Sequence, residues 1–305
     1  MRLALLLCTM LAVVSFAEWY SRTSRQYEPI AYHFLRHSAS SDPTNAVFGD
    51  SHVLTAQRIP GYSFFGWAGE QPEEFLALVQ YLYADTKPKR IILEADPQWF
   101  GEYHAAREKL ATADNFINRH IPLVLSSAYY RATLLKNLVA EIRNWSRSLF
   151  ISRASAAPTA RSAQTRWGEL FGKPGFNWTW MTLEERALLT EERVLGQNPR
   201  EGFEASTSAR DFEQAIAELV QKGASVCLFR TPVTQTYLDM TQTIANSRYA
   251  AHDKYIKAIA ERWHLKYVDF HSIPLDFDDT AFLNQDHMTD AGYDRLWPLV
   301  DKACF

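Results

Sequence analysis

Apolar positions along the chain follow two alternating patterns. Short continuous apolar runs, such as the one at 90–94, favour strands that are buried on both faces of a sheet. Longer segments such as 72–85 place apolar residues three and four apart, with acidic residues in the first turn, and these favour helices. Because the two kinds alternate, we predict an α/β fold with a parallel sheet covered by helices on both faces. The predicted strands are 46–48, 62–67, 90–94, 225–229 and 266–270, and the predicted helices are 72–85, 209–222, 240–263 and 289–302.

The middle of the chain departs from this alternation. In residues 116–176 basic side chains far outnumber acidic ones, and apolar residues recur at helical spacing. Such a stretch can lie on an anionic membrane surface or dock a partner helix. It can equally pack its apolar face on the main sheet and leave its charges in solvent, which is the interpretation we favour. We therefore predict a helical insertion at about 104–205, with a mobile loop at 152–162.

The N-terminus is a nearly continuous apolar run. Residues 3–17 are too few for a membrane-spanning helix of about 20 residues but suit the core of a signal peptide. Ser15-Phe16-Ala17 has the small-x-small pattern of a cleavage site, whereas Trp19 would also suit a membrane interface. We predict that 1–17 is a signal peptide or a membrane anchor. The domain at 18–305 would then be exported to the periplasm or another extracytoplasmic space.

Composition narrows the range of functions. The 305 residues are 47% hydrophobic and 22% charged, as in ordinary globular domains, and the net charge of -3 does not indicate a nucleic-acid partner. Neither zinc-ligand spacing of cysteines nor a glycine-rich phosphate loop is present, so we predict no metal and no cofactor. Outside the N-terminal run the cysteines are Cys227 and Cys304. They either pair in an oxidising compartment or remain buried thiols.

A serine follows directly after the first predicted strand, in the sequence Gly49-Asp50-Ser51-His52. Open α/β sheets bind their ligands at the edge where the parallel strands end, and this is where Ser51 would lie. A helix beginning here would place free backbone N–H groups near the serine oxygen, which suits a developing oxyanion. Alternatively, Asp50 or Ser51 caps that helix. We expect His52 to pack or cap rather than to react.

A histidine near the C-terminus could serve this serine as a base. A serine hydroxyl is a poor nucleophile without a neighbouring base, and histidine is the usual one. His287 stands between a polar loop and the last predicted helix, for which Thr289 is a plausible N-cap. The imidazole also needs an acceptor that fixes its tautomer, and both Asp286 and Asp290 are close in sequence. We interpret Ser51 and His287 as nucleophile and base.

Taken together, these motifs resemble the SGNH/GDSL hydrolase superfamily, over the core strands and both ends of the chain but not over 100–205. The resemblance implies a three-layer α/β/α, flavodoxin-like fold with an inserted helical region. Gly69 follows the second strand, where that family carries an oxyanion-hole glycine. Asp96 stands where the family has an oxyanion-hole asparagine, and a carboxylate cannot donate a hydrogen bond unless it is protonated. The family's acid usually lies three residues before the histidine, where this chain has Asn284, so that either Asp286 replaces the acid or Asn284 orients the ring.

One further run narrows the resemblance. Pro97-Gln98-Trp99-Phe100 is similar to a run in the D-alanyl transfer proteins of lipoteichoic acid modification. An N-terminal anchor before an extracytoplasmic domain is also the layout of alginate-type polysaccharide O-acetylation proteins. Those relatives work beside a membrane-bound O-acyltransferase. The resemblance thus implies a membrane-associated O-acyltransferase or esterase that uses an acyl donor, forms an acyl-serine and acts on a cell-envelope glycan.

Two other functions remain open at this point. An exported lipase or esterase acting on small esters would use the same chemistry. A membrane-anchored scaffold of an acylation complex would keep the fold and lose the activity, as the replacements at Asp96 and Asn284 would allow.

Overall fold

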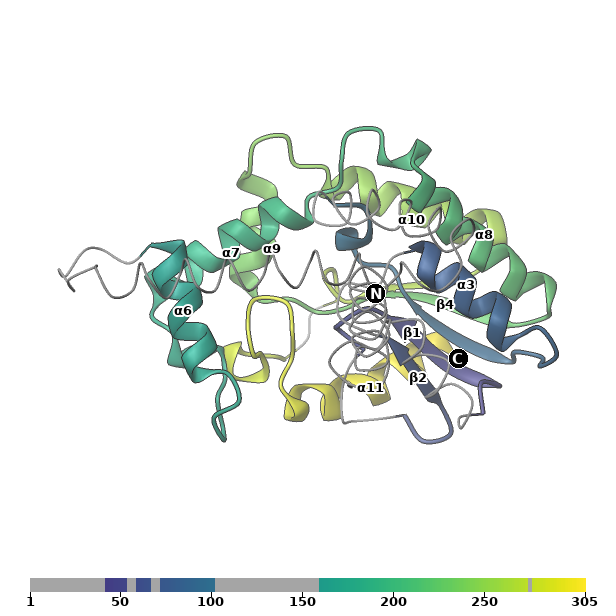
Figure 1. Ribbon diagram of the computed structural model, residues 1–305, viewed down its shortest axis with the longest axis horizontal. Helices are drawn as coiled ribbons and strands as arrows, with labels where there is room; N and C mark the ends of the chain where they lie inside the picture. Colours follow the sequence, from purple (N-terminus) through teal and green to yellow (C-terminus); the bar gives the residue numbers. More distant parts are fainter. Residues whose placement is uncertain (1–41, 54–58, 67–71, 102–158, 274–275) are drawn as a thin grey trace, which may run out of the picture. The chain divides into compact units, whose positions relative to one another are not determined.

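Five parallel strands form the centre of the fold in the order β2-β1-β3-β4-β5 (Figure 1). A computed structural model describes residues 42–53, 59–66, 72–101, 159–273 and 276–305. The strand order is that of flavodoxin-like doubly wound sheets, in which the chain reverses direction across the sheet between β1 and β3. The strands are β1 (Asn45–Gly49), β2 (Ser63–Gly66), β3 (Arg90–Glu94), β4 (Ser225–Arg230) and β5 (Lys266–Asp269).

Helices cover both faces of the sheet and make three layers, as predicted. α3, α8 and α10 pack beside one another on one face, and α11 packs on β4 and β5 from the other (Figure 1). The side chain of Thr289 caps α11 by accepting a hydrogen bond from the N–H of Gly292, which confirms that predicted cap. The helices are α3 (Pro72–Leu82), α6 (Ala160–Leu170), α7 (Leu183–Gln197), α8 (Thr207–Gln221), α9 (Gln235–Thr243), α10 (Tyr249–Trp263) and α11 (Asp290–Cys304), and the 3-10 helices are η1 (Pro97–Phe100), η2 (Trp178–Trp180), η3 (Phe203–Ala205) and η4 (Asp279–Ala281).

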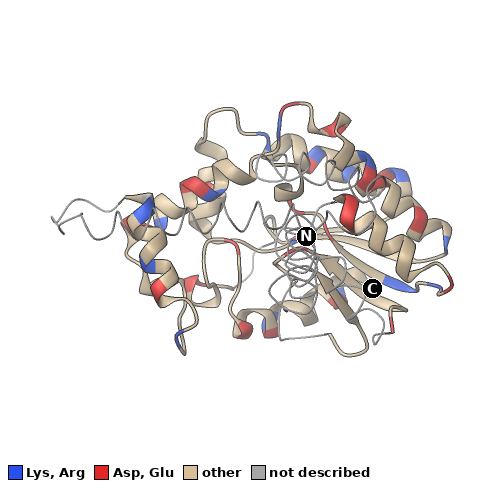
Figure 2. Ribbon diagram, in the orientation of Figure 1, with Lys and Arg blue, Asp and Glu red and all other residues tan. Residues whose placement is uncertain are grey.

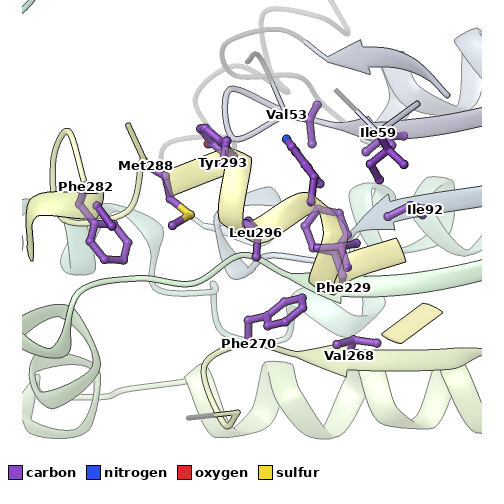
Figure 3. Packing of buried hydrophobic residues seen from close by; sticks show 14 of the residues in the cluster. Val53, Ile59, Ile92, Phe229, Val268, Phe270, Phe282, Met288, Tyr293 and Leu296 are labelled. Carbon is purple, nitrogen blue, oxygen red and sulfur yellow. The ribbon is translucent and has the colours of Figure 1, made fainter. Parts of the chain in front are cut away.

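Strand β1 shows why its apolar run is continuous. Successive side chains of a strand point to opposite faces, so that a strand between two helical layers needs apolar residues at every position. Val47 packs into the cluster formed with α11, whereas the ring of Phe48 lies 5.4 Å from Phe75 on α3. Figure 3 shows the α11 side of the core, where Leu296 lies close to Phe229 of β4. Burial on both faces therefore fixes β1, and with it the turn that carries Ser51.

Several boundaries differ from the prediction by one to three residues, and two segments differ in kind. The segment predicted as one helix at 240–263 forms α9 and α10, because Asn246 between them has a φ of 56° and a right-handed helix does not continue through that conformation. In the loop predicted at 152–162, the helix α6 begins at Ala160, since the Thr159 side chain accepts a hydrogen bond from the Ser162 N–H and caps it. The remainder of that loop, residues 152–158, lies outside the described residues.

The predicted insertion is described only in its second half, where α6, η2, α7 and η3 lie. Basic and acidic residues are interspersed over these helices, and Arg166 on α6 pairs with Glu185 on α7 at 3.1 Å (Figure 2). Most of the basic stretch and the N-terminal run at 3–17 lie outside the described residues. Within the part that is described, no helix is both long and apolar enough to cross a membrane.

A disulfide joins Cys227 on β4 to Cys304 at the end of α11, 77 residues further along the chain. Of the two alternatives for these cysteines, the structure contains the pair. The bond ties the last helix to a central strand, so that α11 and the loop before it are covalently held against the sheet.

The double variant Cys227→Ser/Cys304→Ser should lower the free energy of unfolding by about 2–5 kcal/mol, because a cross-link that closes a long loop restricts the unfolded chain. Urea denaturation of the wild type and the variant measures this difference. Thiol titration of the denatured, unreduced protein is the check on the bond. Reactive thiols at both Cys227 and Cys304 in that assay would contradict it.

Candidate active site

Ser51 lies in a tight turn at the carboxyl end of β1. The Asp50 N–H donates to Glu94 Oε2 at 2.8 Å, and the His52 N–H donates to Asp50 Oδ1 at 3.0 Å. Gly49 lets the turn approach β3 closely, since a Cβ at this position would lie 2.1 Å from Glu94 Oε2. These contacts hold Ser51 above the sheet at the point where the strand order reverses, which is the ligand-binding position of this fold.

The loop before α11 brings His287 to Ser51. His287 Nε2 lies 2.8 Å from Ser51 Oγ, within hydrogen-bond distance, although the two residues are 236 positions apart in the sequence. Asn284 shapes this loop, because its Oδ1 accepts hydrogen bonds from the N–H of Asp286 at 3.0 Å and from that of His287 at 2.7 Å. The Leu283 N–H also donates to the carbonyl of His287 at 2.8 Å. The histidine is thus held by its own loop backbone.

Both predicted orienting groups reach the other ring nitrogen of His287. Nδ1 lies 3.0 Å from Asp286 Oδ1 and 3.2 Å from Asn284 Oδ1. A proton on Nδ1 can be shared between these acceptors, and Nε2 is then the nitrogen that accepts the Ser51 hydroxyl proton. Asp290, the other acid considered, lies at the start of α11. Geometry alone allows Asp286 and Asn284 to orient the ring together.

Charge distinguishes Asp286 from Asn284. The Asp286 carboxylate is buried, and its Oδ2 accepts hydrogen bonds from Arg193 Nε and Gln197 Nε2, both at 2.7 Å. Burial opposes ionisation, but the Arg193 guanidinium and His287 outweigh it and hold the pKa of Asp286 well below its usual range. Asp286 is therefore an anion that can stabilise an imidazolium, whereas Asn284 offers only an amide dipole.

His287 is set up as a base. Burial lowers the pKa of its imidazole, and although Asp286 raises it, the charge on His52 lowers it further, so that the net shift is downward. At neutral pH the ring is therefore uncharged and ready to take a proton from Ser51. A general base must be in this form before the reaction starts.

Three contributors to the site were missed or undervalued by the sequence analysis. His52, expected only to pack or cap, stacks on His287 with ring centroids 4.3 Å apart and an angle of 15° between the planes. Arg193 and Gln197 come from α7, in the segment predicted as an insertion. They lie 93 and 89 positions from Asp286, and no motif marks either one. For His52, the adjacent serine was the one signal in the sequence.

Asp96 does not take the position of an oxyanion donor. Its Oδ1 accepts a hydrogen bond from the Thr231 N–H at 3.1 Å, and its Oδ2 accepts one from the Thr231 hydroxyl. Both oxygens thus act as acceptors that link the end of β3 to the residue after β4. The Ser51 N–H, by contrast, has no acceptor in the described part of the chain and is a candidate oxyanion donor. Gly69, the other predicted donor, lies outside the described residues. Residues 51–53 form a turn rather than the first residues of the expected helix, and residues 54–58 lie outside the described residues.

The site contains two groups of potential metal ligands among the described residues. They are His52 with Asp286 and His287, and His52 with Asp50 and Glu94. In both groups the ligand atoms are already hydrogen-bonded to protein atoms, for example His52 Nδ1 to Asp50 Oδ1 at 2.6 Å. A metal ion would have to replace these bonds, so the arrangement favours proton transfer rather than metal binding.

Comparisons with known proteins add little to this geometry. No family model matches the chain, and no curated protein matches its sequence. A crystal structure of a "putative acylhydrolase" from Bacteroides fragilis aligns with 92% of this chain and 98% of its own length, at 12% sequence identity and a TM-score of 0.41. A TM-score of this size does not establish a shared fold. The fold therefore rests on the strand order, and the site on its own contacts.

Proposed function

We propose that this protein is a serine-dependent acyl hydrolase or acyltransferase. The observation that carries the proposal is the contact of 2.8 Å between His287 Nε2 and Ser51 Oγ, with the buried Asp286 carboxylate on the other ring nitrogen. A serine, a histidine and a carboxylate in this order are the parts needed to activate a hydroxyl nucleophile.

The reaction follows from these positions. Ser51 Oγ attacks the carbonyl carbon of an ester or thioester while its proton passes to His287 Nε2. The negative charge that develops on the carbonyl oxygen is stabilised by the Ser51 N–H, and the positive charge on His287 by Asp286. When the tetrahedral intermediate collapses, His287 gives the proton to the leaving group and an acyl-serine remains. Water or a sugar hydroxyl then attacks the acyl-serine carbonyl, with His287 again taking the proton. The bond to Ser51 Oγ breaks as His287 returns that proton to the serine, which releases the acid or the acylated sugar.

The finer parts of the proposal concern place and substrate. We propose that the protein works outside the cytoplasm and transfers acyl groups to or from a cell-envelope glycan, beside a membrane-bound O-acyltransferase. Three observations support this: the signal-like run at 3–17, the Cys227–Cys304 disulfide, which suits an oxidising compartment, and the resemblance to SGNH-type acyl-transfer proteins.

A fluorophosphonate probe tests the catalytic part directly, because it reacts with serines that are activated by a neighbouring base. The purified protein should be labelled, and mass spectrometry of its peptides should place the label on Ser51. Prior denaturation should abolish labelling, since the base is brought to Ser51 only by the fold. A folded protein that stays unlabelled would favour the scaffold function instead.

Transfer and hydrolysis are separated by adding an acceptor. With 4-nitrophenyl acetate as donor, release of nitrophenol is measured with and without a soluble polysaccharide, and the polysaccharide is analysed for new ester groups. A transferase should release nitrophenol slowly in water and faster with the acceptor, which becomes acetylated. Rapid turnover in water that ignores the polysaccharide would indicate an esterase acting on small esters.

A further inference from the structure

A second histidine lies directly behind the predicted base. His52 is 1% exposed, and its ring is stacked on that of His287 at 4.3 Å. It comes from the turn after β1, whereas His287 comes from the loop before α11. The base is therefore supported on one face of its ring by a side chain that is anchored in the centre of the sheet.

Carboxyl groups face both ring nitrogens of His52. Nδ1 lies 2.6 Å from Asp50 Oδ1 and 3.2 Å from Glu94 Oε1, and Nε2 lies 3.5 Å from Asp286 Oδ2. Carboxylates only accept hydrogen bonds, so a ring placed between them is stabilised when both of its nitrogens carry protons. The Gln98 amide nitrogen also lies 3.0 Å from Nδ1, but it donates to Glu94 Oε1 at 2.7 Å and to Asp50 Oδ2 at 3.3 Å. This environment favours the imidazolium form of His52.

The charges around the ring agree with this assignment. Burial alone would lower the pKa of His52, but the charges of Asp50 and Glu94 and the contact with Asp286 raise it well above its usual value. Asp50 remains ionised beside it, because the attraction of His52 outweighs the effect of burial and lowers the pKa of Asp50. For Glu94, burial and the neighbouring Asp50 raise the pKa.

We infer that His52 is a positioning residue: as a buried imidazolium it fixes the plane of the His287 ring and keeps that ring uncharged in mildly acidic solution. The inference rests on the proposed function in that His287 is taken as the general base. Two like charges at this ring separation repel, so a proton on His287 is less favourable while His52 is charged. The consequence is a reactive base over a pH range that extends further to the acid side.

Other charged groups near the two rings also affect the pKa of His287. The negative charge of Asp286 raises this pKa, whereas the positive charges of His52 and Arg193 lower it. When the His52 charge is removed, less positive charge counteracts the effect of Asp286, so the pKa of His287 must rise. Among the described residues, the ionisable and polar groups that contact or electrostatically influence either ring are Asp50, Ser51, Glu94, Asp96, Gln98, Arg193, His271, Asn284, Asp286 and Tyr293.

The variant His52→Asn tests the inference. The asparagine amide can still donate towards Asp50 in place of Nδ1–H, but it carries no charge and has no ring to stack. The pKa of His287, followed by NMR of histidine-labelled protein, should rise by roughly 1 unit or more. In the pH profile of kcat/KM for ester turnover, the acid limb should shift to higher pH by the same amount. At a pH well below the pKa of His287, kcat/KM of the variant, expressed as a fraction of its own plateau, should therefore be about tenfold lower than that of the wild type.

A purely structural role would give another pattern. Loss of packing alone would lower the plateau of kcat/KM at every pH and leave the acid limb where it was. The matched control is His264→Asn, an exposed histidine with a φ of 55° that asparagine tolerates, and it should change neither quantity. An unmoved His287 pKa in folded His52→Asn protein would overturn the inference.

The protonation state of His52 can also be measured in the wild-type protein, without a variant and without an activity assay. The nitrogen chemical shifts of His52 should be those of a ring protonated at both positions from about pH 6 to pH 8. A neutral His52 at pH 7 would overturn the inference even if His52→Asn failed to fold. Failure of the proposed function would look different, because Ser51 would remain unlabelled by the fluorophosphonate while the coupled titration of the two histidines persisted.

Discussion

Ser51→Ala should reduce kcat for ester turnover by about 10⁴-fold or more, because it removes the hydroxyl that His287 Nε2 contacts at 2.8 Å. Without this oxygen no acyl-serine can form, and what remains is the effect of binding and of the oxyanion donors on attack by water. The change deletes a single oxygen from a half-buried side chain, so the fold should be retained.

Initial rates with 4-nitrophenyl acetate, together with fluorophosphonate labelling, measure this effect. Ser225→Ala serves as the matched control, since Ser225 is an exposed serine at the start of β4 and takes no part in the site. Thermal unfolding of both variants shows whether the fold is intact. Unchanged turnover and labelling in folded Ser51→Ala protein would disprove the proposed nucleophile.

Asp286→Asn should lower kcat by about 10³- to 10⁴-fold, whereas Asn284→Ala should lower it by about tenfold or less. The buried carboxylate compensates the charge that forms on His287 in the transition state, and an amide cannot do so. The substitution also removes the ion pair of Arg193. In addition, the NH₂ group of the new amide must face a group that also donates, either Gln197 Nε2 or the Nδ1–H of His287. Asn284, by contrast, mainly shapes the loop backbone.

Steady-state kinetics of both variants resolve the alternative that the sequence left open. The acid limb of the pH profile provides a second criterion. Loss of the Asp286 charge removes the interaction that favours protonated His287, so the limb should shift to lower pH, while Asn284→Ala should leave it in place. The reverse order of effects on kcat would show that Asn284, rather than Asp286, orients the ring.

The alternation of buried runs and amphipathic segments in the sequence was sufficient to predict the parallel sheet. All five strands lie where they were predicted. The runs in the interior strands β1, β3 and β4 are almost continuously buried, because a strand between two helical layers must be apolar on both faces. The prediction of a single helix at 240–263 was wrong. The chain breaks at Asn246, which adopts a left-handed conformation between α9 and α10, and this segment contains no glycine or proline that would mark the break in the sequence. Local pattern is a weak guide to such boundaries.

For the site, sequence alone was enough to predict that Ser51 and His287 lie together, because a serine after β1 and a histidine before α11 both lie at the carboxyl edge of a parallel sheet. It left open whether Asp286 or Asn284 orients the ring. The sequence did not predict that Asp96 accepts hydrogen bonds from Thr231, or that Arg193 and His52 contribute to the site. These three depend on which side chains from separate elements meet in the folded chain. A charge is retained inside a protein only where partners compensate for lost water. Those partners, brought from α7, β3 and the C-terminal loop, become visible only once the chain has folded.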